Sequence, residues 1–281
     1  MSERILITGA AGRIGSALRP LLARPGRVLR LLDINPVKPG DAESSEGIEI
    51  VTASFADPKA INEACEGVDA VVHLGGKPGE GSWKELAEVN VEGTRQVLEA
   101  AVRQGVPRIV LASSIHAAGF WTRDDLGPDG CLPAATAPRP DTYYGVSKAA
   151  VEALGSLYHS RFGIDVSCLR LGAYRAAPLS ATDLVVWISH EDGARLVEAC
   201  LAAPAPAAFR VVWGLSANSR SWFSPAEGAA IGYEPQDDAE RFVAGIPGVD
   251  GFDWSAPVLH LAGGGFCAVP LGSADRPPAG F

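Results

Sequence analysis

Three residues in the middle of the chain have the types and the spacing of an acid–base site. Tyr144 and Lys148 lie four residues apart, so a helix would present both on one face. An ammonium beside a phenol favours the phenolate, which would let Tyr144 take up or donate a proton near neutral pH. Ser114 ends an apolar run and would hydrogen-bond the reacting oxygen. These residues predict a site that moves the proton of an alcohol.

A glycine-rich turn near the N-terminus is typical of a site for a dinucleotide. Gly9, Gly12 and Gly15 follow an apolar run and open an amphipathic stretch, the pattern of a strand, a tight turn and a helix. The N–H groups at that helix start would face a pyrophosphate. Asp33 ends the next apolar run and could accept hydrogen bonds from both ribose hydroxyls while repelling a 2′-phosphate, so the predicted cofactor is NAD.

The composition is that of a globular protein without a membrane segment. The 281 residues are 47% apolar and 20% charged, and no apolar run approaches the roughly 18 residues of a membrane span. A net charge of −9 argues against a nucleic-acid partner. Five cysteines without a Cys-x-x-Cys pair form neither a disulfide framework nor a zinc site, so we expect reduced thiols, no metal and a cytoplasmic location. The sequence does not determine the oligomeric state, and a homo-oligomer is compatible with it.

Alternating apolar runs and amphipathic stretches predict an α/β fold, a Rossmann-type doubly wound parallel sheet with a small C-terminal substrate lobe. The expected strands are Arg4–Thr8, Val28–Asp33, Ile48–Thr52, Ala70–Leu74, Arg108–Ser113, Asp165–Leu169 and Phe209–Trp213. The expected helices are Arg13–Ala23, Pro58–Cys65, Trp83–Gln104, Tyr144–Phe162 and Glu191–Leu201, with Pro20 shortening or kinking the first. We expect an NAD-binding core over 1–172 and a lobe over 173–281, partly interleaved with the core. The tail over 263–281 would dock or fray.

The turn and the Tyr-x-x-x-Lys motif resemble the extended short-chain dehydrogenase/reductase family, the NAD-dependent epimerase/dehydratase type. The resemblance covers about residues 4–235 and includes Asn90–Thr94. It implies a catalytic set of Ser114, Tyr144 and Lys148. It implies cofactor contacts from Gly9, Gly12, Arg13, Ile14, Gly15, Asp33, Ser54, Phe55, Leu74, Asn90, Tyr144 and Lys148, with Asn90 in a supporting role.

A narrower resemblance links the chain to the NAD-dependent uronate dehydrogenases, which oxidise the anomeric carbon of a uronate to an aldarolactone. The similar stretches are His73–Gly76, Leu111–His116, Trp187–Asp192 and Val211–Asn218. His116 matches a residue that faces the sugar in that group. Four polar substrate contacts of the group are replaced here, by Pro78, Ile115, Ala173 and, at the carboxylate-binding arginine, Thr182. The expected substrate residues are Lys77, Ile115, His116, Ala173, Arg175 and Thr182.

The leading prediction is an NAD-dependent dehydrogenase that oxidises a hydroxyl of a sugar, sugar acid or related alcohol, with weak activity on uronates. Lys77 or Arg175 could instead supply the missing cation and restore uronate activity. A nucleotide-sugar epimerase or dehydratase would use the same residues but needs a platform for the nucleotide, which the sequence does not show. A dinucleotide-sensing regulator would tend to lack the Tyr/Lys pair. Net NADH formation separates these alternatives.

Overall fold

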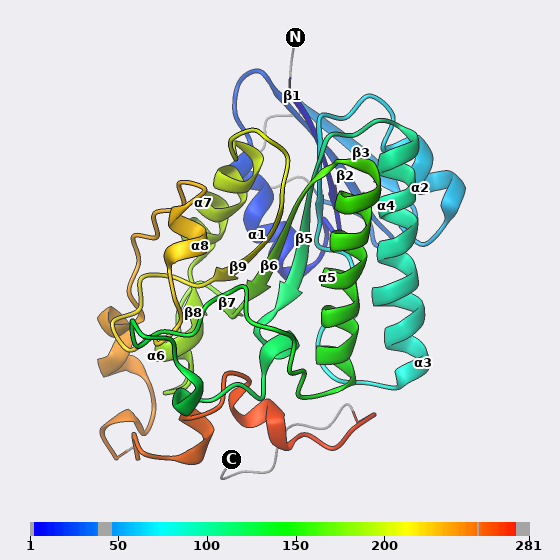
Figure 1. The fold of residues 1–281 in the computed structure, drawn as a ribbon. Helices are drawn as coiled ribbons and strands as arrows, with labels where there is room; N and C mark the ends of the chain where they lie inside the picture. Colours follow the sequence, from blue (N-terminus) through cyan, green and yellow to red (C-terminus); the bar gives the residue numbers. More distant parts are fainter. Residues whose placement is uncertain (1–2, 39–46, 252, 274–281) are drawn as a thin grey trace.

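Seven parallel strands form the central sheet of the computed structural model, which describes residues 3–38, 47–251 and 253–273 (Figure 1). Their order across the sheet is β3-β2-β1-β4-β5-β6-β9. The direction of strand addition reverses between β1 and β4, which is where open α/β sheets bind ligands. The strand bounds are β1 Glu3–Thr8, β2 Arg27–Asp33, β3 Ile48–Thr52, β4 Ala70–His73, β5 Arg108–Ser114, β6 Asp165–Leu171 and β9 Phe209–Gly214. The predicted Rossmann-type fold is therefore confirmed.

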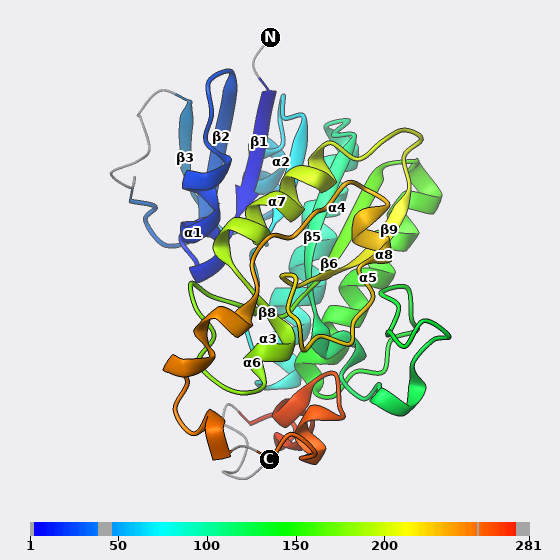
Figure 2. The same cartoon turned by 90° about the vertical axis from the view of Figure 1, so that its left-hand side faces the viewer.

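Helices cover both faces of the sheet (Figures 1 and 2). One face carries α1 (Arg13–Leu22) and α7 (His190–Leu201), which contact each other, and the other carries α2 (Pro58–Ala64), α4 (Gly93–Arg103) and α5 (Tyr143–Phe162). The central strands β1, β4, β5 and β6 are buried on both sides, which explains their continuous apolar runs. Pro20 lies inside α1, which ends at Leu22.

The helix expected over Trp83–Gln104 changes its hydrogen-bond pattern in the middle. It begins as α3 (Trp83–Leu86), continues as a π-helix over Ala87–Glu92 and ends as α4. A π segment inserts one extra residue per turn and often lies at a functional site. Here it includes Asn90, whose buried side chain forms hydrogen bonds with Lys77 in the loop after β4 and with Ser147 in α5.

The residues beyond 172 contribute both to the sheet and to a small lobe. Strand β9 and helix α7 belong to the core, whereas β7 (Ala173–Tyr174), β8 (Trp187–Ile188), α6 (Asp183–Val186) and α8 (Ala226–Ala229) lie outside the main sheet. Short 3-10 helices complete the lobe. This interleaving follows from the chain path, because β7, α6 and β8 lie between β6 and α7, whereas α8 and the later 3-10 helices follow β9.

The described part of the C-terminal segment packs across the end of the molecule where the strands have their carboxyl ends. Figure 1 shows it, in orange and red, beyond the carboxyl ends of the strands. A 3-10 helix over Gly264–Ala268 places Phe266 against His116, with ring centroids 4.1 Å apart. Gly272 N donates to Glu80 Oε1 at 2.8 Å. This part of the expected tail docks; residues 274–281 lie outside the described residues.

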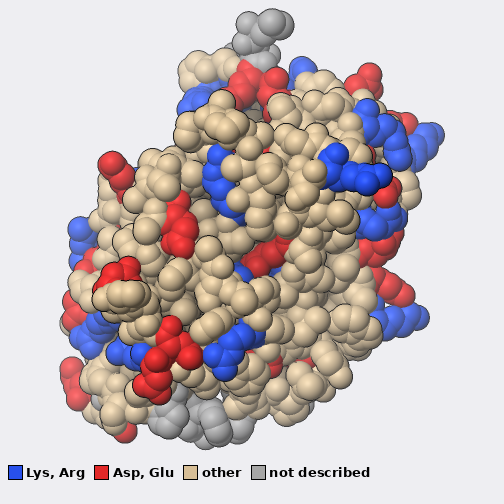
Figure 3. Space-filling model, viewed as in Figure 1, with Lys and Arg blue, Asp and Glu red and all other residues tan. Residues whose placement is uncertain are grey.

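Charges on the face viewed in Figure 3 are mixed rather than gathered by sign. Acidic and basic side chains alternate along the edge that carries α2 and α4, where Arg95 pairs with Glu92 and Glu99. All five cysteines are free thiols, and Cys65, Cys168 and Cys200 are buried. Among the described helices, none combines the length and the apolar character needed to cross a lipid bilayer.

Candidate active site

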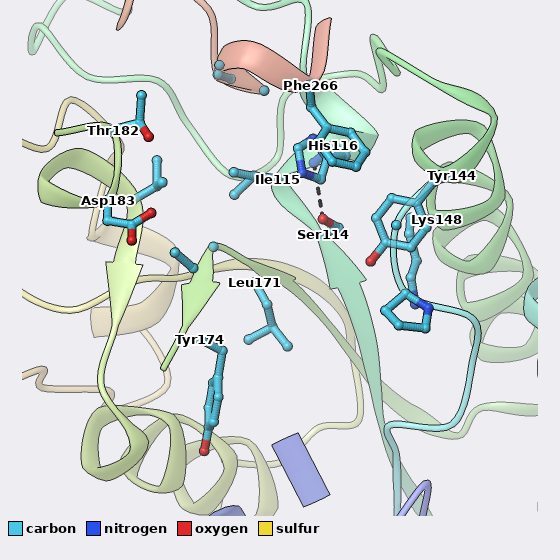
Figure 4. Close-up of a pocket in the computed structure, with 18 of the residues that line it drawn as sticks. Ser114, Ile115, His116, Tyr144, Lys148, Leu171, Tyr174, Thr182, Asp183 and Phe266 are labelled. Carbon is cyan, nitrogen blue, oxygen red and sulfur yellow. Dashed lines mark hydrogen bonds between the residues drawn. The ribbon is translucent and has the colours of Figure 1, made fainter. Parts of the chain in front are cut away.

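A cavity of about 500 Å³ opens at the carboxyl edge of the sheet. Its walls come from the segments that follow β1, β4, β5 and β6, from the start of α5, and from the lobe and the C-terminal segment (Figure 4). Twelve of the predicted site residues line it: Arg13, Ile14, Leu74, Lys77, Ser114, Ile115, His116, Tyr144, Lys148, Ala173, Arg175 and Thr182. The fold therefore brings together side chains that are more than 160 positions apart in the sequence.

The glycine turn has a geometry that only glycines permit. Gly9 adopts φ +71°, and a Cβ there would lie 2.6 Å from Gly75 N. A Cβ on Gly15 would lie 2.4 Å from Gly9 O. Gly12 is the N-cap of α1 and places no side chain over the first turn, so the N–H groups of that turn stay accessible. This cradle fits a pyrophosphate.

Asp33 lies beside the turn at the end of β2. Its Oδ2 accepts from Ala11 N at 2.9 Å and its Oδ1 from Asn35 N at 2.9 Å, so the carboxylate is fixed with a lone pair left on each oxygen. Ser54 and Phe55 do not line the cavity. Phe55 packs edge-on against His73, with centroids 5.1 Å apart, and a Cβ on Gly75 would collide with its ring. The cofactor roles of Ser54 and Phe55 stay predictions.

A buried chain of hydrogen bonds stiffens the sheet behind the turn. Thr94 Oγ1 donates to Asn90 O at 2.6 Å, so it accepts from His73 Nε2 at 3.1 Å. The other ring nitrogen of His73 then accepts from Thr8 Oγ1 at 2.6 Å. Burial lowers the pKa of His73 to about 3, which keeps the ring neutral. His73 is therefore a packed histidine with both ring nitrogens hydrogen-bonded.

Asn90 connects the loop after β4 to α5. Its Oδ1 accepts from Lys77 N at 2.7 Å, and its Nδ2 donates to Ser147 Oγ at 2.9 Å. Ser147 Oγ donates in turn to Tyr144 O at 2.7 Å. Asn90, which we expected to have a supporting role, therefore holds the backbone around Tyr144.

Ser114, Tyr144 and Lys148 face the same part of the cavity (Figure 4). Ser114 is the last residue of β5, and Tyr144 and Lys148 lie one turn apart near the start of α5, which Thr142 caps through Gly145 N at 3.0 Å. The Lys148 ammonium lies 5.6 Å from the centre of the Tyr144 ring and donates to Ala112 O at 2.8 Å. The predicted acid–base grouping is thus present in space.

Burial controls the charges of this group. It raises the pKa of Tyr144 to about 12, although a hydrogen bond with Ser114 opposes the shift, and it lowers the pKa of Lys148 to about 8. We expected the Lys148 ammonium to favour the phenolate of Tyr144, and this expectation is wrong for this structure. Burial of the phenol raises its pKa, and the ammonium, which donates to Ala112 O, does not offset that rise. Tyr144 is a protonated phenol at neutral pH here.

These pKa values predict the pH dependence of alcohol oxidation. The active form needs the Tyr144 phenolate to accept a proton and the Lys148 ammonium to stabilise it. Below about pH 8 Lys148 stays charged, so the population of this form rises with pH as more phenolate forms. Above about pH 8 the gain of phenolate is cancelled by the loss of ammonium, so the population levels off. A plot of log kcat/KM against pH, from NADH absorbance, should therefore bend near pH 8. In Lys148→Met the bend should disappear; a bend that persists would contradict the assignment.

A second group lies at the substrate end of the cavity. His116 Nδ1 contacts Oδ2 of Asp141 at 2.7 Å, and the Asp141 side chain is fully buried. Because a carboxylate oxygen only accepts, Nδ1 of His116 carries a proton, and Nε2 is the ring nitrogen that remains for a ligand. Phe266 covers the imidazole, and Ile115 lines the adjoining wall with other apolar side chains.

The two cations considered as replacements for an arginine are both paired. Lys77 Nζ lies 3.0 Å from Glu85 Oε1, and Arg175 Nη1 lies 3.2 Å from Asp183 Oδ2. The hydroxyl of Thr182 lies 2.9 Å from Ser180 Oγ. In this structure the substrate end therefore has no unpaired cation among the expected substrate residues.

Sequence reasoning missed several residues of the site. Asp141, Asp183 and Phe266 contact or line it, and Glu80 accepts from Tyr144 N at 2.8 Å, which fixes the N-terminus of α5. Trp222 packs in an apolar cluster of the lobe and lines the cavity as well. These residues stand in loops or short helices without a motif, so no spacing rule points to them.

The residues present fit NAD. The glycine cradle and helix start suit the pyrophosphate, and the fixed Asp33 carboxylate suits a ribose diol. Ile14 and Leu74 line the same cavity as Tyr144 and Lys148. Within the described residues, no cluster of three His, Cys, Asp or Glu side chains suits a metal ion.

Comparisons with known proteins agree with this geometry. The model of the NAD dependent epimerase/dehydratase family matches residues 5–176. The uronate dehydrogenase of Pseudomonas putida is 36% identical over 95% of this chain and 96% of its own. The NAD-dependent glucose-6-phosphate dehydrogenase of Haloferax volcanii is 35% identical over 86% of this chain and 96% of its own. A tyrosine-to-alanine variant of Agrobacterium tumefaciens uronate dehydrogenase, complexed with NAD, is 34% identical with a TM-score of 0.85, covering 96% of this chain and 98% of the other. The chain therefore belongs to the NAD dependent epimerase/dehydratase family, as an oxidoreductase that uses NAD.

Proposed function

We propose that this protein oxidises the anomeric hydroxyl of a free sugar and that it prefers a neutral sugar to a uronate. The observation that carries the proposal is the grouping of Ser114, Tyr144 and Lys148 on one side of a cavity of about 500 Å³. A cavity of that size accommodates a monosaccharide beside a nicotinamide. The relatives named above act on a uronate and on glucose 6-phosphate, which supports a sugar as the substrate class.

The side chains divide the chemical work. Ser114 Oγ hydrogen-bonds the reacting oxygen and holds it against Tyr144. Tyr144, as phenolate, accepts the hydroxyl proton, while the Lys148 ammonium stabilises the negative charge of the phenolate. Bound NAD supplies the hydride acceptor. The apolar wall and the docked C-terminal segment exclude water from the reacting carbon.

An epimerase or dehydratase is the weaker alternative. Such an enzyme returns the hydride to its substrate and forms no net NADH, and its nucleotide-sugar substrates need space beyond the monosaccharide. Here Phe266 and the glycines before it line the cavity, and Phe266 packs against His116. A sensor without turnover would not need the Ser114, Tyr144 and Lys148 grouping.

The proposal predicts a clear difference between a sugar and its blocked glycoside. D-Galactose should reduce NAD to NADH, whereas methyl β-D-galactopyranoside should not, because its anomeric oxygen has no proton for Tyr144 to accept. The measurement is NADH absorbance with both compounds at matched concentrations, together with D-glucose, D-glucuronate and D-galacturonate. Oxidation of the glycoside would place the reaction at another hydroxyl. Efficient oxidation of a uronate that is lost in Lys77→Ala or Arg175→Ala would overturn the preference for a neutral sugar.

We also infer a cytoplasmic location. The support is the state of the cysteines: all five are unpaired in the structure, and three of them are buried, which suits a reducing compartment.

A further inference from the structure

Asp183 and Arg175 form an ion pair on the wall of the cavity opposite the catalytic group. Figure 4 shows Asp183 and Thr182 across the cavity from Tyr144 and Ser114. Asp183 begins α6, and its side chain is only 9% exposed. The pair joins Asp183 Oδ2 to Arg175 Nη1 at 3.2 Å, and Leu179 N donates to the same oxygen at 2.8 Å. The carboxylate is therefore held in one position.

The Asp183 carboxylate limits which substrate groups can bind to the Arg175 guanidinium. A substrate carboxylate that approached Arg175 would also lie beside the Asp183 carboxylate, and two like charges in a partly buried site repel strongly. Thr182, next to Asp183, brings a hydroxyl that is already engaged with Ser180. The wall thus carries one negative and one positive charge in contact, with no net attraction for an anion.

Asp183 gives the same wall a hydrogen-bond acceptor next to the donors of Arg175. Both described contacts of the Asp183 side chain use Oδ2, so Oδ1 remains for a ligand. Acceptors of this kind match hydroxyl groups, which can donate, and do not match a carboxylate, which only accepts.

We propose that Asp183, with Arg175 held against it, is a specificity-determining residue that binds the hydroxyl-bearing end of a neutral sugar and disfavours a carboxylate there. This inference rests on the proposed function and deepens it, because it assigns the choice between a sugar and its acid to one side chain.

The test compares D-galactose with D-galacturonate, which differ only at C6. For the wild type we expect the higher kcat/KM with galactose. Asp183→Asn keeps an oxygen for Leu179 N but removes the negative charge and leaves Arg175 unpaired. It should lower kcat/KM for galactose about 10-fold, mainly through KM, and raise it for galacturonate about 10-fold. Their ratio should fall about 100-fold. Thr182→Arg, added to Asp183→Asn, should favour galacturonate further.

A reciprocal variant separates this role from general damage. Arg175→Gln leaves Asp183 without its cation, so the ratio should move the opposite way, with galacturonate oxidised still more slowly. A residue needed only for folding would lower both activities in both variants. Glu240→Gln is the control, because Glu240 pairs with Arg220 in the same lobe but does not line the cavity, and it should leave the ratio unchanged.

An unchanged galactose-to-galacturonate ratio in Asp183→Asn would overturn the inference, as would a wild type that prefers galacturonate. If the wild type oxidises neither sugar, the proposed function fails on its own. The subsite is then tested by binding, through quenching of tryptophan fluorescence by each sugar in the presence of NAD, since Trp222 lines the cavity. Equal affinity of the wild type and Asp183→Asn for galactose would exclude the subsite.

Discussion

Tyr144→Phe should lower kcat by at least about 1,000-fold, because the ring remains while the phenol that would take the substrate proton is gone. NAD affinity should change by no more than a few-fold. The pyrophosphate cradle lies after β1, and Asn90 and Glu80 hold the backbone around position 144 through main-chain contacts that the substitution keeps. Initial rates of NADH formation and a fluorescence titration with NADH measure the two effects separately.

Tyr143→Phe is the matched control for this variant. Tyr143 is the neighbouring phenol on the same helix, but its ring packs edge-on against Trp83, 5.8 Å between centroids, and it does not line the cavity. Its activity should stay close to that of the wild type. If Tyr144→Phe kept more than a tenth of the wild-type kcat, another group would have to be the acid–base residue.

The second large effect is a preference for NAD over NADP of about 100-fold or more in kcat/KM. Backbone N–H groups of Ala11 and Asn35 hold the Asp33 carboxylate beside the glycine turn, where the 2′-phosphate of NADP would meet a fixed negative charge. The nearby cation Arg30 is engaged by Glu49 and by two backbone carbonyls, so it does not offset this repulsion.

Asp33→Asn should reduce this preference at least about 10-fold, because the amide keeps an acceptor but loses the charge. The readout is kcat/KM for both cofactors at a saturating concentration of the sugar. Glu63→Gln serves as control, since it removes an exposed carboxylate paired with Lys59 on α2 and should leave the preference unaltered. Equal use of both cofactors by the wild type would contradict the role of Asp33.

Much of the fold and the cofactor site could be predicted from local sequence. Apolar runs in β1, β4 and β5 signal strands buried on both faces, and the spacing of Gly9, Gly12 and Gly15 has no simpler use than a tight turn that opens a helix. The four-residue spacing of Tyr144 and Lys148 places them on one helix face before any tertiary contact forms. These features depend on the backbone geometry of a few consecutive residues. The sequence alone is therefore enough to predict them.

Only the tertiary structure decided the charges and the substrate end. The spacing of Lys148 and Tyr144 suggested a lowered phenol pKa, but burial reverses the direction, and burial depends on elements far away in the chain. Arg175 and Lys77 looked like free cations until the fold placed Asp183 and Glu85 beside them. Phe266 belongs to a glycine-rich segment with no periodic pattern, and it reaches the site because that segment docks across the ends of the strands. Desolvation and ion pairing act through space, and a linear sequence does not state which groups share that space.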